Sequence, residues 1–309
     1  MSQGHKLKGA VIGVGYLGQF HAQKLHSNQD VDLCGVFDPH TEQASKVASQ
    51  LGTKAYHQLS DVAKEVDFVT IAAATKAHYE LAEYFLSQGK AVLVEKPIAA
   101  TSEQGFKLAE LADKKNLIFS VGHIERFNPA YQPIIDSASS TIYFEITRWA
   151  PFRMRGADVS VLHDLMIHDL DLIQYIFKSK VKSWMVSGHK IIQPTIDDVS
   201  VRLVLENNLQ VTINNSRLHP EIVRHYRALQ KDRTLFVNTA NLEGQILTKS
   251  QQDPFFTVQK FQLSKVDALN LEICHFVKAV KKEVPVAISP FEACLALQTV
   301  EQINSELEN

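Results

Sequence analysis

The sequence predicts an α/β protein: first a doubly wound parallel sheet, then an α+β domain with an open, mainly antiparallel sheet. Three observations predict this. The chain has 309 residues, which is too many for one typical core and suits two domains. Up to about residue 123, strand patterns alternate with helix patterns, as in a parallel sheet covered on both faces. Later strand patterns follow one another without helices, which favours antiparallel pairing. We expect domains at 1–122 and 123–309, with the C-terminal helix packing back at their junction.

The first strand leads into a glycine-rich turn. Residues 7–12 (LKGAVI) form the strand, GVGYLG follows, and a helix pattern begins in FHAQKLHS. The next strand, 31–38, ends at Asp38, about 20 positions after the last glycine. This order is the dinucleotide-binding fingerprint of the Rossmann fold, in which pyrophosphate approaches the helix N-terminus and the acid binds the ribose. A generic turn before a strand-end aspartate is the less favoured alternative. The cofactor residues predicted in the turn are Gly13, Gly15, Tyr16, Leu17 and Gly18.

The residue at the end of the second strand also bears on the choice of cofactor. The carboxylate of Asp38 would accept hydrogen bonds from a 2′-hydroxyl and repel a 2′-phosphate. Pro39 and His40 follow, and neither supplies an arginine to bind that phosphate. The sequence therefore favours NAD over NADP.

The remaining elements of the first domain keep the alternation. Further strands are predicted at 67–75, 91–97 and 117–123. The helix after the first of these ends at Gly89, and the helix after the second is capped by Ser102 or Thr101. Pro97 stops the middle strand. Because ligands bind at the carboxyl ends of parallel strands, polar residues at these ends join the predicted cofactor site. They are Ala73, Thr75, His78, Glu95 and Lys96.

Lys96 stands out among these polar residues. It follows a buried strand, between a glutamate and a proline, so its direction should be fixed. At that strand end it would face a bound nicotinamide and could take part in proton handling. The alternative is a solvated lysine on a loop, which is the commonest environment of lysine.

The second domain begins with a short helix in FNPAYQPIIDS and then becomes rich in strands. Residues 141–149 alternate, and VSVRLVLE and LQVTINNS form a hairpin around Asn207 and Asn208. The stretch VRHYRALQKDRTLFVN adds one or two strands, and two helices end the chain. One face of this sheet should be buried. The other is either solvated or meets a second subunit, and we favour the second subunit.

Residues 159–178, which contain LHDLMIHDLD, fit a helix. Positions four apart share a helix face, so Asp164 and His168 are neighbours and Asp171 extends their stripe. His163 and Asp169 point elsewhere and receive structural roles. A metal site is disfavoured, because no HExxH motif or cysteine set supplies further ligands. A hydrogen-bonded pair in a core and a catalytic pair both stay open, and Lys96 favours the catalytic one.

Charge, apolar runs and cysteine spacing argue against nucleic-acid-binding, membrane-spanning and disulfide-rich proteins. The net charge is −2, so nucleic acid and membrane surfaces are not indicated as partners. No apolar run approaches the roughly 20 residues of a membrane span, and the N-terminus does not resemble a signal peptide. Cys34, Cys274 and Cys294 lie far apart without a CxxC motif. These features indicate a reducing, cytoplasmic setting.

The motifs together resemble the glucose–fructose oxidoreductase/inositol dehydrogenase (Gfo/Idh/MocA) family over essentially the whole chain. The matching pieces are VIGVGYLGQFHAQKL, TKAHYELAEYFLSQGKAVLVEKPIA and the DxxxH of Asp164 and His168. The resemblance implies hydride transfer between the nicotinamide and a hydroxyl-bearing carbon of a sugar. It implies that Lys96 holds the reacting hydroxyl, His168 accepts its proton and Asp164 orients the histidine or its contact with substrate. It also implies a homodimer or homotetramer built through the C-terminal sheet.

Two stretches resemble one branch of this family, the UDP-N-acetylglucosamine 3-dehydrogenases. They are GHIERFNPA and TRWAPFRMRGADVSVLHDLMIHDLDLI. The resemblance implies a nucleotide-sugar substrate and a 3-keto product, and arginine forks suit its diphosphate. Ion pairing of those arginines within the protein is the alternative. A free-sugar or inositol dehydrogenase and a non-catalytic NAD(P)-binding regulator are alternative functions. The predicted substrate residues are Arg126, Asn128, Arg148, Arg153 and Arg155.

Overall fold

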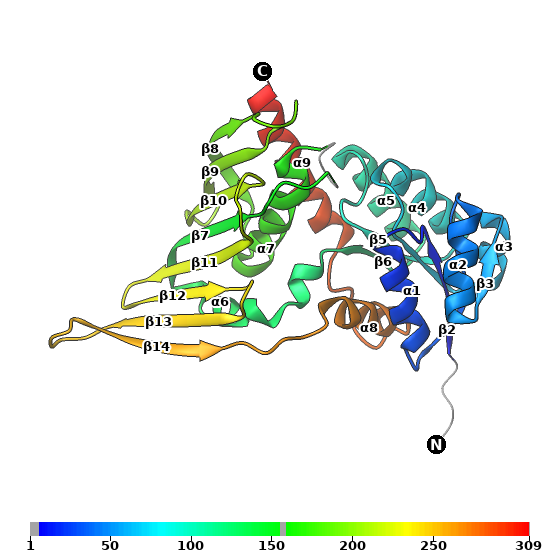
Figure 1. Ribbon diagram of the computed structural model, residues 1–309, viewed down its shortest axis with the longest axis horizontal. Helices are drawn as coiled ribbons and strands as arrows, with labels where there is room; N and C mark the ends of the chain where they lie inside the picture. The colour runs from blue at the N-terminus through cyan, green and yellow to red at the C-terminus, as the bar shows by residue number, and fades with distance from the viewer. Residues whose placement is uncertain (1–5, 155–158, 309) are drawn as a thin grey trace. The chain divides into compact units, whose positions relative to one another are not determined.

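The computed structural model describes residues 6–154 and 159–308. Contacts divide the chain into two compact units. The first consists of Met1–Phe127 and Asp267–Leu295, and the second of Asn128–Val266 and Ala296–Asn309. Figure 1 shows the elements of each, and the two units are described one at a time.

The first unit contains a six-stranded sheet in the order β3-β2-β1-β4-β5-β6. All neighbouring strands pair in parallel, which confirms the predicted doubly wound parallel sheet. The short strand β3 was not predicted. The strands are β1 (Leu7–Ile12), β2 (Val31–Phe37), β3 (Lys54–Tyr56), β4 (Phe68–Ile71), β5 (Ala91–Glu95) and β6 (Phe119–Gly122).

Helices from two parts of the chain complete the first unit. Its helices are α1 (Gly18–Ser27), α2 (Thr41–Leu51), α3 (Leu59–Glu65), α4 (His78–Ser87), α5 (Ser102–Lys114) and α8 (Ala268–Val280). The hydroxyl of Thr101 caps α5 by accepting the N–H of Gln104, as one of the two predicted caps. Helix α8 comes from much later in the sequence, and its Phe276 ring lies 5.6 Å from that of Phe68 in the core.

The second unit contains an eight-stranded sheet in the order β14-β13-β12-β11-β7-β10-β9-β8. Only β7 and β10 pair in parallel, so the sheet is mainly antiparallel, as predicted. Asn208, with φ of 66°, lies in the predicted turn between β9 and β10. The strands are β7 (Thr141–Trp149), β8 (Val181–His189), β9 (Asp198–Leu205), β10 (Gln210–Ser216), β11 (Val223–Gln230), β12 (Arg233–Asn238), β13 (Glu243–Lys249) and β14 (Phe256–Gln262).

Helix α7 (Ile167–Phe177) packs on one face of this sheet. Its Phe177 ring lies 5.1 Å from the ring of Phe144, which is buried beside Ile146 on the inner face of β7. Short helical segments occupy the region predicted as one short helix, and α9 contributes to both units. The short segments are η2 (Ile124–Phe127), η3 (Pro129–Tyr131), α6 (Gln132–Ile135) and η4 (Ala138–Ser140), whereas α9 is the long helix Pro290–Glu308.

The prediction of one continuous α-helix over 159–178 needs correction. The helical segment begins with a π-helix, η5 (Leu162–Met166), and only then continues as α7. A π turn closes over five residues rather than four. The four-residue spacing used to pair Asp164 with His168 therefore does not describe the backbone through Asp164.

Within 6–154 and 159–308, no helix has the length and hydrophobicity needed to cross a membrane. The same residues contain no group of three or more His, Cys, Asp or Glu side chains placed to hold a metal ion.

Candidate active site

The three glycines of the turn between β1 and α1, Gly13, Gly15 and Gly18, have different structural roles. Gly13 has φ of 83°, and a Cβ atom there would lie 2.7 Å from the backbone of Ala73. A Cβ atom on Gly18 would overlap the carbonyl oxygen of Gly13. At Gly15, by contrast, a Cβ atom would have no neighbour within 4 Å. Gly13 and Gly18 therefore shape the turn, while Gly15 leaves open space beside the N-terminus of α1. This arrangement fits the pyrophosphate of a dinucleotide.

Asp38 lies beside this turn, at the carboxyl end of β2. Its side chain is buried, and Oδ2 accepts a hydrogen bond from the N–H of Val14 at 2.9 Å. Oδ1 accepts one from the N–H of His40 at 2.9 Å. The first unit therefore brings the predicted acid and the predicted glycines together, which fits a ribose next to a pyrophosphate.

The aromatic and aliphatic residues of the turn lie nearer to solvent. Tyr16 is 63% exposed, and its ring meets that of Phe20 edge-on at 5.5 Å. Leu17 directly precedes α1 and is half-buried. Both are placed where they can flank a ligand bound at Gly15.

His78 joins two strand ends. It begins α4 and is buried, with Nδ1 2.7 Å from the carbonyl oxygen of Pro97 and Nε2 3.0 Å from that of Ala73. Burial lowers the pKa of His78 more than these carbonyls raise it. A neutral imidazole carries one N–H, so one of the two contacts is a hydrogen bond at any moment. His78 fixes the backbone after β4 and β5, and Thr75 lies just before it in η1 (Thr75–Ala77).

Glu95 ends β5, directly before Lys96. One of its carboxylate oxygens lies 2.8 Å from Nε2 of His21, which is buried on α1. The other accepts the backbone N–H of Lys96 at 3.2 Å. Burial acts to raise the pKa of Glu95, but the bond to His21 and the charges of His21 and Lys96 outweigh it and lower the pKa. Glu95 therefore holds the backbone at Lys96. Sequence analysis missed His21, although it is the second residue of the helical stretch FHAQKLHS.

In the second unit, Asp164 and His168 lie on the same helical segment, Asp164 in its π part and His168 in α7. Both side chains are half-buried. His163 faces Ser160, whose hydroxyl lies 2.9 Å from Nδ1, and burial lowers the pKa of His163. Asp169 is fully buried. The environments of His163 and Asp169 suit the structural roles predicted for them.

The predicted substrate residues occupy different environments. Arg148 is buried and donates to Oδ1 of Asp169 from Nε and Nη2 at 2.9 and 2.8 Å. Arg126, in the first unit, pairs with Glu292 at 2.7 Å. Both arginines thus match the ion-pair alternative. Arg153 is exposed, and Arg155 lies outside the described residues. The side chain of Asn128 caps η3 by accepting the N–H of Ala130 at 3.0 Å.

The two units offer complementary chemistry. The first holds an open glycine turn after β1, a fixed acid after β2 and a lysine after β5. The second supplies a histidine and a carboxylate on one helical segment. The first unit can thus bind a dinucleotide, and the second carries side chains able to transfer a proton.

Comparison with known proteins covers both units. Residues 7–123 match "Oxidoreductase family, NAD-binding Rossmann fold" and residues 138–228 match "GFO/IDH/MocA C-terminal domain". UDP-N-acetylglucosamine 3-dehydrogenase of Acidithiobacillus ferrooxidans is 32% identical over 285 residues, covering 91% of this chain and 90% of that one. The solved structure of GnnA, named as this dehydrogenase from the same organism, has a TM-score of 0.93 at 31% identity and covers 98% of each chain.

A second relative acts on a different kind of substrate. The scyllo-inositol 2-dehydrogenase (NAD(+)) of Bacillus subtilis is 25% identical over 319 residues, covering 95% of this chain and 92% of that one. The similarity to these relatives, in sequence and in structure, thus extends along nearly the whole chain. This protein belongs to the Gfo/Idh/MocA family of NAD-binding oxidoreductases.

Proposed function

We propose that this protein uses NAD⁺ to oxidise the C3 hydroxyl of a UDP-N-acetyl sugar, with UDP-N-acetylglucosamine as the first candidate. The geometric observation that carries the proposal is the open space at Gly15 beside the fixed carboxylate of Asp38. The sugar class is supported by the relative from Acidithiobacillus ferrooxidans, which is similar over 91% of this chain and 90% of its own. The product would be a 3-keto nucleotide sugar, formed as hydride leaves C3.

Asp38 supports NAD over NADP in this proposal. Its carboxylate is buried, and no arginine or lysine in the described chain forms an ion pair with it. A negative charge so placed attracts ribose hydroxyls and repels a 2′-phosphate. The Gly15 side of the turn receives the pyrophosphate.

The residues of the chain then divide the proton chemistry between them. Lys96, whose backbone is held by Glu95, binds the reacting hydroxyl and stabilises the developing alkoxide. His168 accepts the hydroxyl proton, and Asp164 orients His168 or its contact with the substrate. The nicotinamide supplies the hydride acceptor when it is bound. Arg153 is the exposed cation that we assign to the diphosphate.

Formation of NADH on addition of nucleotide and free sugars tests the proposal. We expect UDP-N-acetylglucosamine to reduce NAD⁺, while Lys96→Met and His168→Asn each lower kcat by at least 100-fold. Lys90→Met is the control for Lys96, because Lys90 lies before β5 and binds the carbonyl of Val66. Preference for inositol would favour the activity of the Bacillus subtilis relative instead. NAD binding without turnover of any sugar would favour a regulator.

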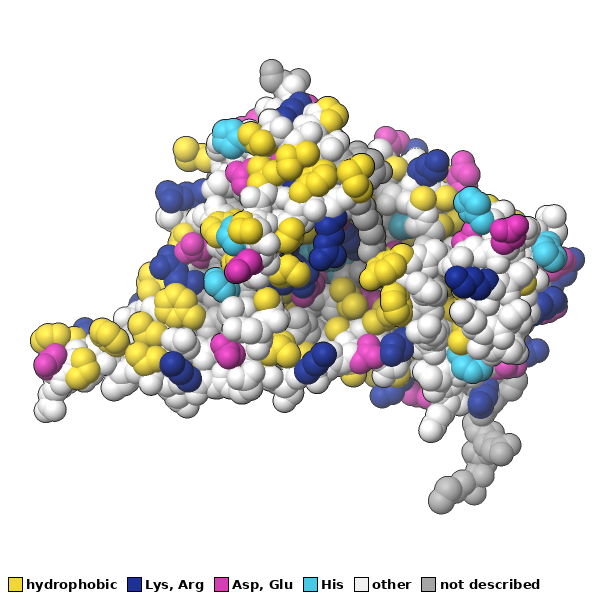
Figure 2. Space-filling view, in the orientation of Figure 1, with side chains coloured by type: hydrophobic (Ala, Val, Ile, Leu, Met, Phe, Trp, Pro, Cys, Tyr) yellow, Lys and Arg dark blue, Asp and Glu magenta, His cyan; other side chains and the backbone are white. Residues whose placement is uncertain are grey.

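We also propose that the outer face of the second sheet, opposite α7, binds a second copy of the chain. This face carries the exposed side chains of Leu229 and Phe236 and a hollow of about 620 Å³ beside Arg227. Figure 2 shows further hydrophobic side chains at the end of the β13–β14 hairpin, where Phe255 and Phe256 are exposed.

Light scattering tests this surface. We expect the mass of a dimer or tetramer, and a monomer for Phe236→Lys. Ile142→Lys is the matched control. Ile142 is also large and exposed, but it lies on the opposite face of the sheet, the face of the buried Phe144 and Ile146 in β7. A monomeric wild-type protein would contradict the proposal.

A further inference from the structure

A buried ion pair in the second unit joins the ends of two strands. Asp197 directly precedes β9, and Arg217 directly follows β10. Their side chains are 0% and 7% exposed, and Nε of Arg217 donates to Oδ1 of Asp197 at 2.6 Å. Sequence analysis did not single out either residue.

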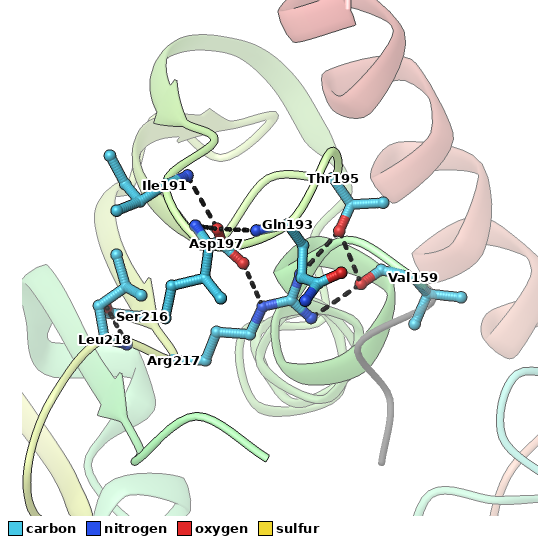
Figure 3. Close-up of polar contacts among 9 residues, drawn as sticks. Val159, Ile191, Gln193, Thr195, Asp197, Ser216, Arg217 and Leu218 are labelled. Atoms are coloured by element: carbon cyan, nitrogen blue, oxygen red, sulfur yellow. Dashed lines mark hydrogen bonds and ion pairs between the residues drawn. The ribbon is translucent and has the colours of Figure 1, made fainter. Parts of the chain in front are cut away.

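Asp197 is held on its other side by the loop before it. Figure 3 shows its carboxylate facing the backbone of that loop. Oδ2 accepts the N–H groups of Ile191, Ile192 and Gln193 at 2.8, 2.6 and 3.0 Å. Burial acts to raise the pKa of Asp197, but these N–H groups and Arg217 outweigh it and bring the pKa to about 2. Asp197 is therefore a charged group, held by four hydrogen bonds, that binds the guanidinium.

The far side of the guanidinium reaches a different segment. Nη1 of Arg217 donates to the carbonyl oxygen of Val159 at 2.9 Å, and Nη2 donates to the hydroxyl of Thr195 at 2.7 Å (Figure 3). The ring of Phe152 lies 5.7 Å from the guanidinium carbon. Because the planar guanidinium directs its N–H groups along fixed lines, its bond to Asp197 also fixes the position of Val159.

Val159 leads directly into the helical segment that carries the candidate catalytic residues. The N–H of Val161 donates to the carbonyl of Ile196 at 2.8 Å. The carbonyl of Ser160 then accepts the N–H groups of His163 and Asp164 at 3.0 and 3.1 Å. The backbone from Val159 to Asp164 is thus attached to the loop that Asp197 organises.

We propose that Arg217, held by Asp197, is a positioning residue that sets Asp164 and His168 for proton transfer. This inference rests on the proposed function, in which His168 accepts the proton of the sugar hydroxyl. A displacement of about 1 Å in a reacting group costs on the order of 100-fold in rate. A small shift at Val159 is therefore enough to matter at His168.

Arg217→Lys tests the proposal and keeps a positive charge beside Asp197. Lysine lacks the planar fork that reaches Val159 and Thr195 at once. Lys190→Gln is the matched control, because it removes an exposed ion pair with Glu308 next to the same loop. We expect Arg217→Lys to lower kcat for sugar oxidation at least tenfold and to leave the KM for NAD⁺ within twofold. Lys190→Gln should match the wild type.

An isotope effect separates positioning from loss of folded enzyme. With sugar deuterated at the oxidised carbon, the deuterium effect on kcat/KM should rise in Arg217→Lys, because the chemical step becomes slower than the steps around it. A lower kcat with an unchanged isotope effect would overturn the proposal, since less folded enzyme gives that result. A kcat within twofold of the wild type would also overturn it.

Hydrogen–deuterium exchange of residues 159–168, measured without substrate, provides a readout that does not need the proposed activity. We expect faster exchange in Arg217→Lys than in the wild type or Lys190→Gln. If the wild type oxidises no sugar, the proposed function fails, while exchange still decides whether Arg217 fixes this segment. Unchanged exchange would overturn the inference. Should Arg217→Lys not fold, Thr195→Val removes one of the guanidinium's contacts and should show a smaller change in the same direction.

Discussion

The carboxylate of Asp38 accepts the backbone N–H of Val14 at 2.9 Å, and this bond ties the end of β2 to the glycine turn. The second carboxylate oxygen accepts the N–H of His40 at 2.9 Å. An ionised carboxylate offers about four lone-pair sites, so these two bonds leave acceptor capacity for a ribose. Asp38 can therefore shape the turn and bind the cofactor at the same time.

Asp38→Asn should weaken the preference for NAD⁺. The amide keeps one oxygen acceptor but loses the negative charge that repels a 2′-phosphate. We expect the ratio of kcat/KM for NAD⁺ to that for NADP⁺ to fall at least tenfold, or about 1.4 kcal/mol. Asp32→Asn, on an exposed position of the same strand, is the control and should leave the ratio unchanged. An unaltered ratio in Asp38→Asn would contradict the role of Asp38.

Substitutions at two glycines should separate cofactor binding from folding. Gly15→Ala adds a methyl group where the chain has no neighbour within 4 Å, so the Tm should change little. The same methyl group would occupy space needed by the pyrophosphate, and we expect the Kd for NAD⁺ to rise at least tenfold by calorimetry. Gly18→Ala, whose methyl group would overlap Gly13, should instead lower the Tm. Wild-type affinity in Gly15→Ala would show that the cofactor does not approach there.

The ion pair of Arg148 and Asp169 predicts a structural effect rather than a loss of substrate binding. Arg148→Met would leave the Asp169 carboxylate buried without its cation, at a cost of about 3–5 kcal/mol in the free energy of unfolding. Lys107→Met breaks an exposed pair with Glu103 on α5 and should cost at most about 1 kcal/mol. Urea unfolding measures both. If Arg148→Met keeps wild-type stability and only raises the KM for the nucleotide sugar, the substrate role predicted from sequence is the right one.

Glu272 on α8 predicts how stability changes with pH. Its carboxyl is buried, and neither oxygen has a hydrogen-bond partner among the described residues. Burial and the charge of Glu95 raise the pKa of Glu272 well above 4.5. Above pH 4.5 the unfolded chain therefore releases a proton that the folded protein keeps, and stability falls as pH rises toward the folded-state pKa.

Glu272→Gln removes this titration while keeping the size of the side chain. The Tm of the variant should exceed that of the wild type by a few degrees at pH 8, and the difference should vanish near pH 4. Glu110→Gln, which changes an exposed glutamate of α5, is the control and should keep the wild-type pH dependence. Equal pH dependence in wild type and Glu272→Gln would show that Glu272 ionises normally.

Sequence predicted best those features that are determined by neighbouring residues in the chain. The glycine turn, the acid at the end of β2 and the Thr101 cap each follow from residues close together in the chain. Strands β8, β13 and β14 were missed, and β14 shows why: nearly all its side chains are exposed, so no buried face imposes an alternating pattern. The π segment was missed because hydrophobic spacing over a few residues does not separate a four-residue turn from a five-residue one.

The partners of buried charges were beyond the reach of local patterns. Arg148 was predicted to face a diphosphate because it is an arginine near the expected site. Its partner Asp169 is fixed by how α7 lies on the sheet, which the sequence does not state. Arg217 and Asp197 meet only because β9 and β10 pair in an antiparallel hairpin.

Transfer of the label from UDP-N-acetylglucosamine deuterated at C3 is the most direct test of the proposed function. The protein, NAD⁺ and this sugar are mixed, and the mass of the reduced cofactor is measured. Our account predicts reduced cofactor that carries one deuterium, together with a 3-keto nucleotide sugar. Unlabelled NADH would mean oxidation at another carbon. No reduction of NAD⁺, under conditions where the protein binds NAD⁺, would contradict the account.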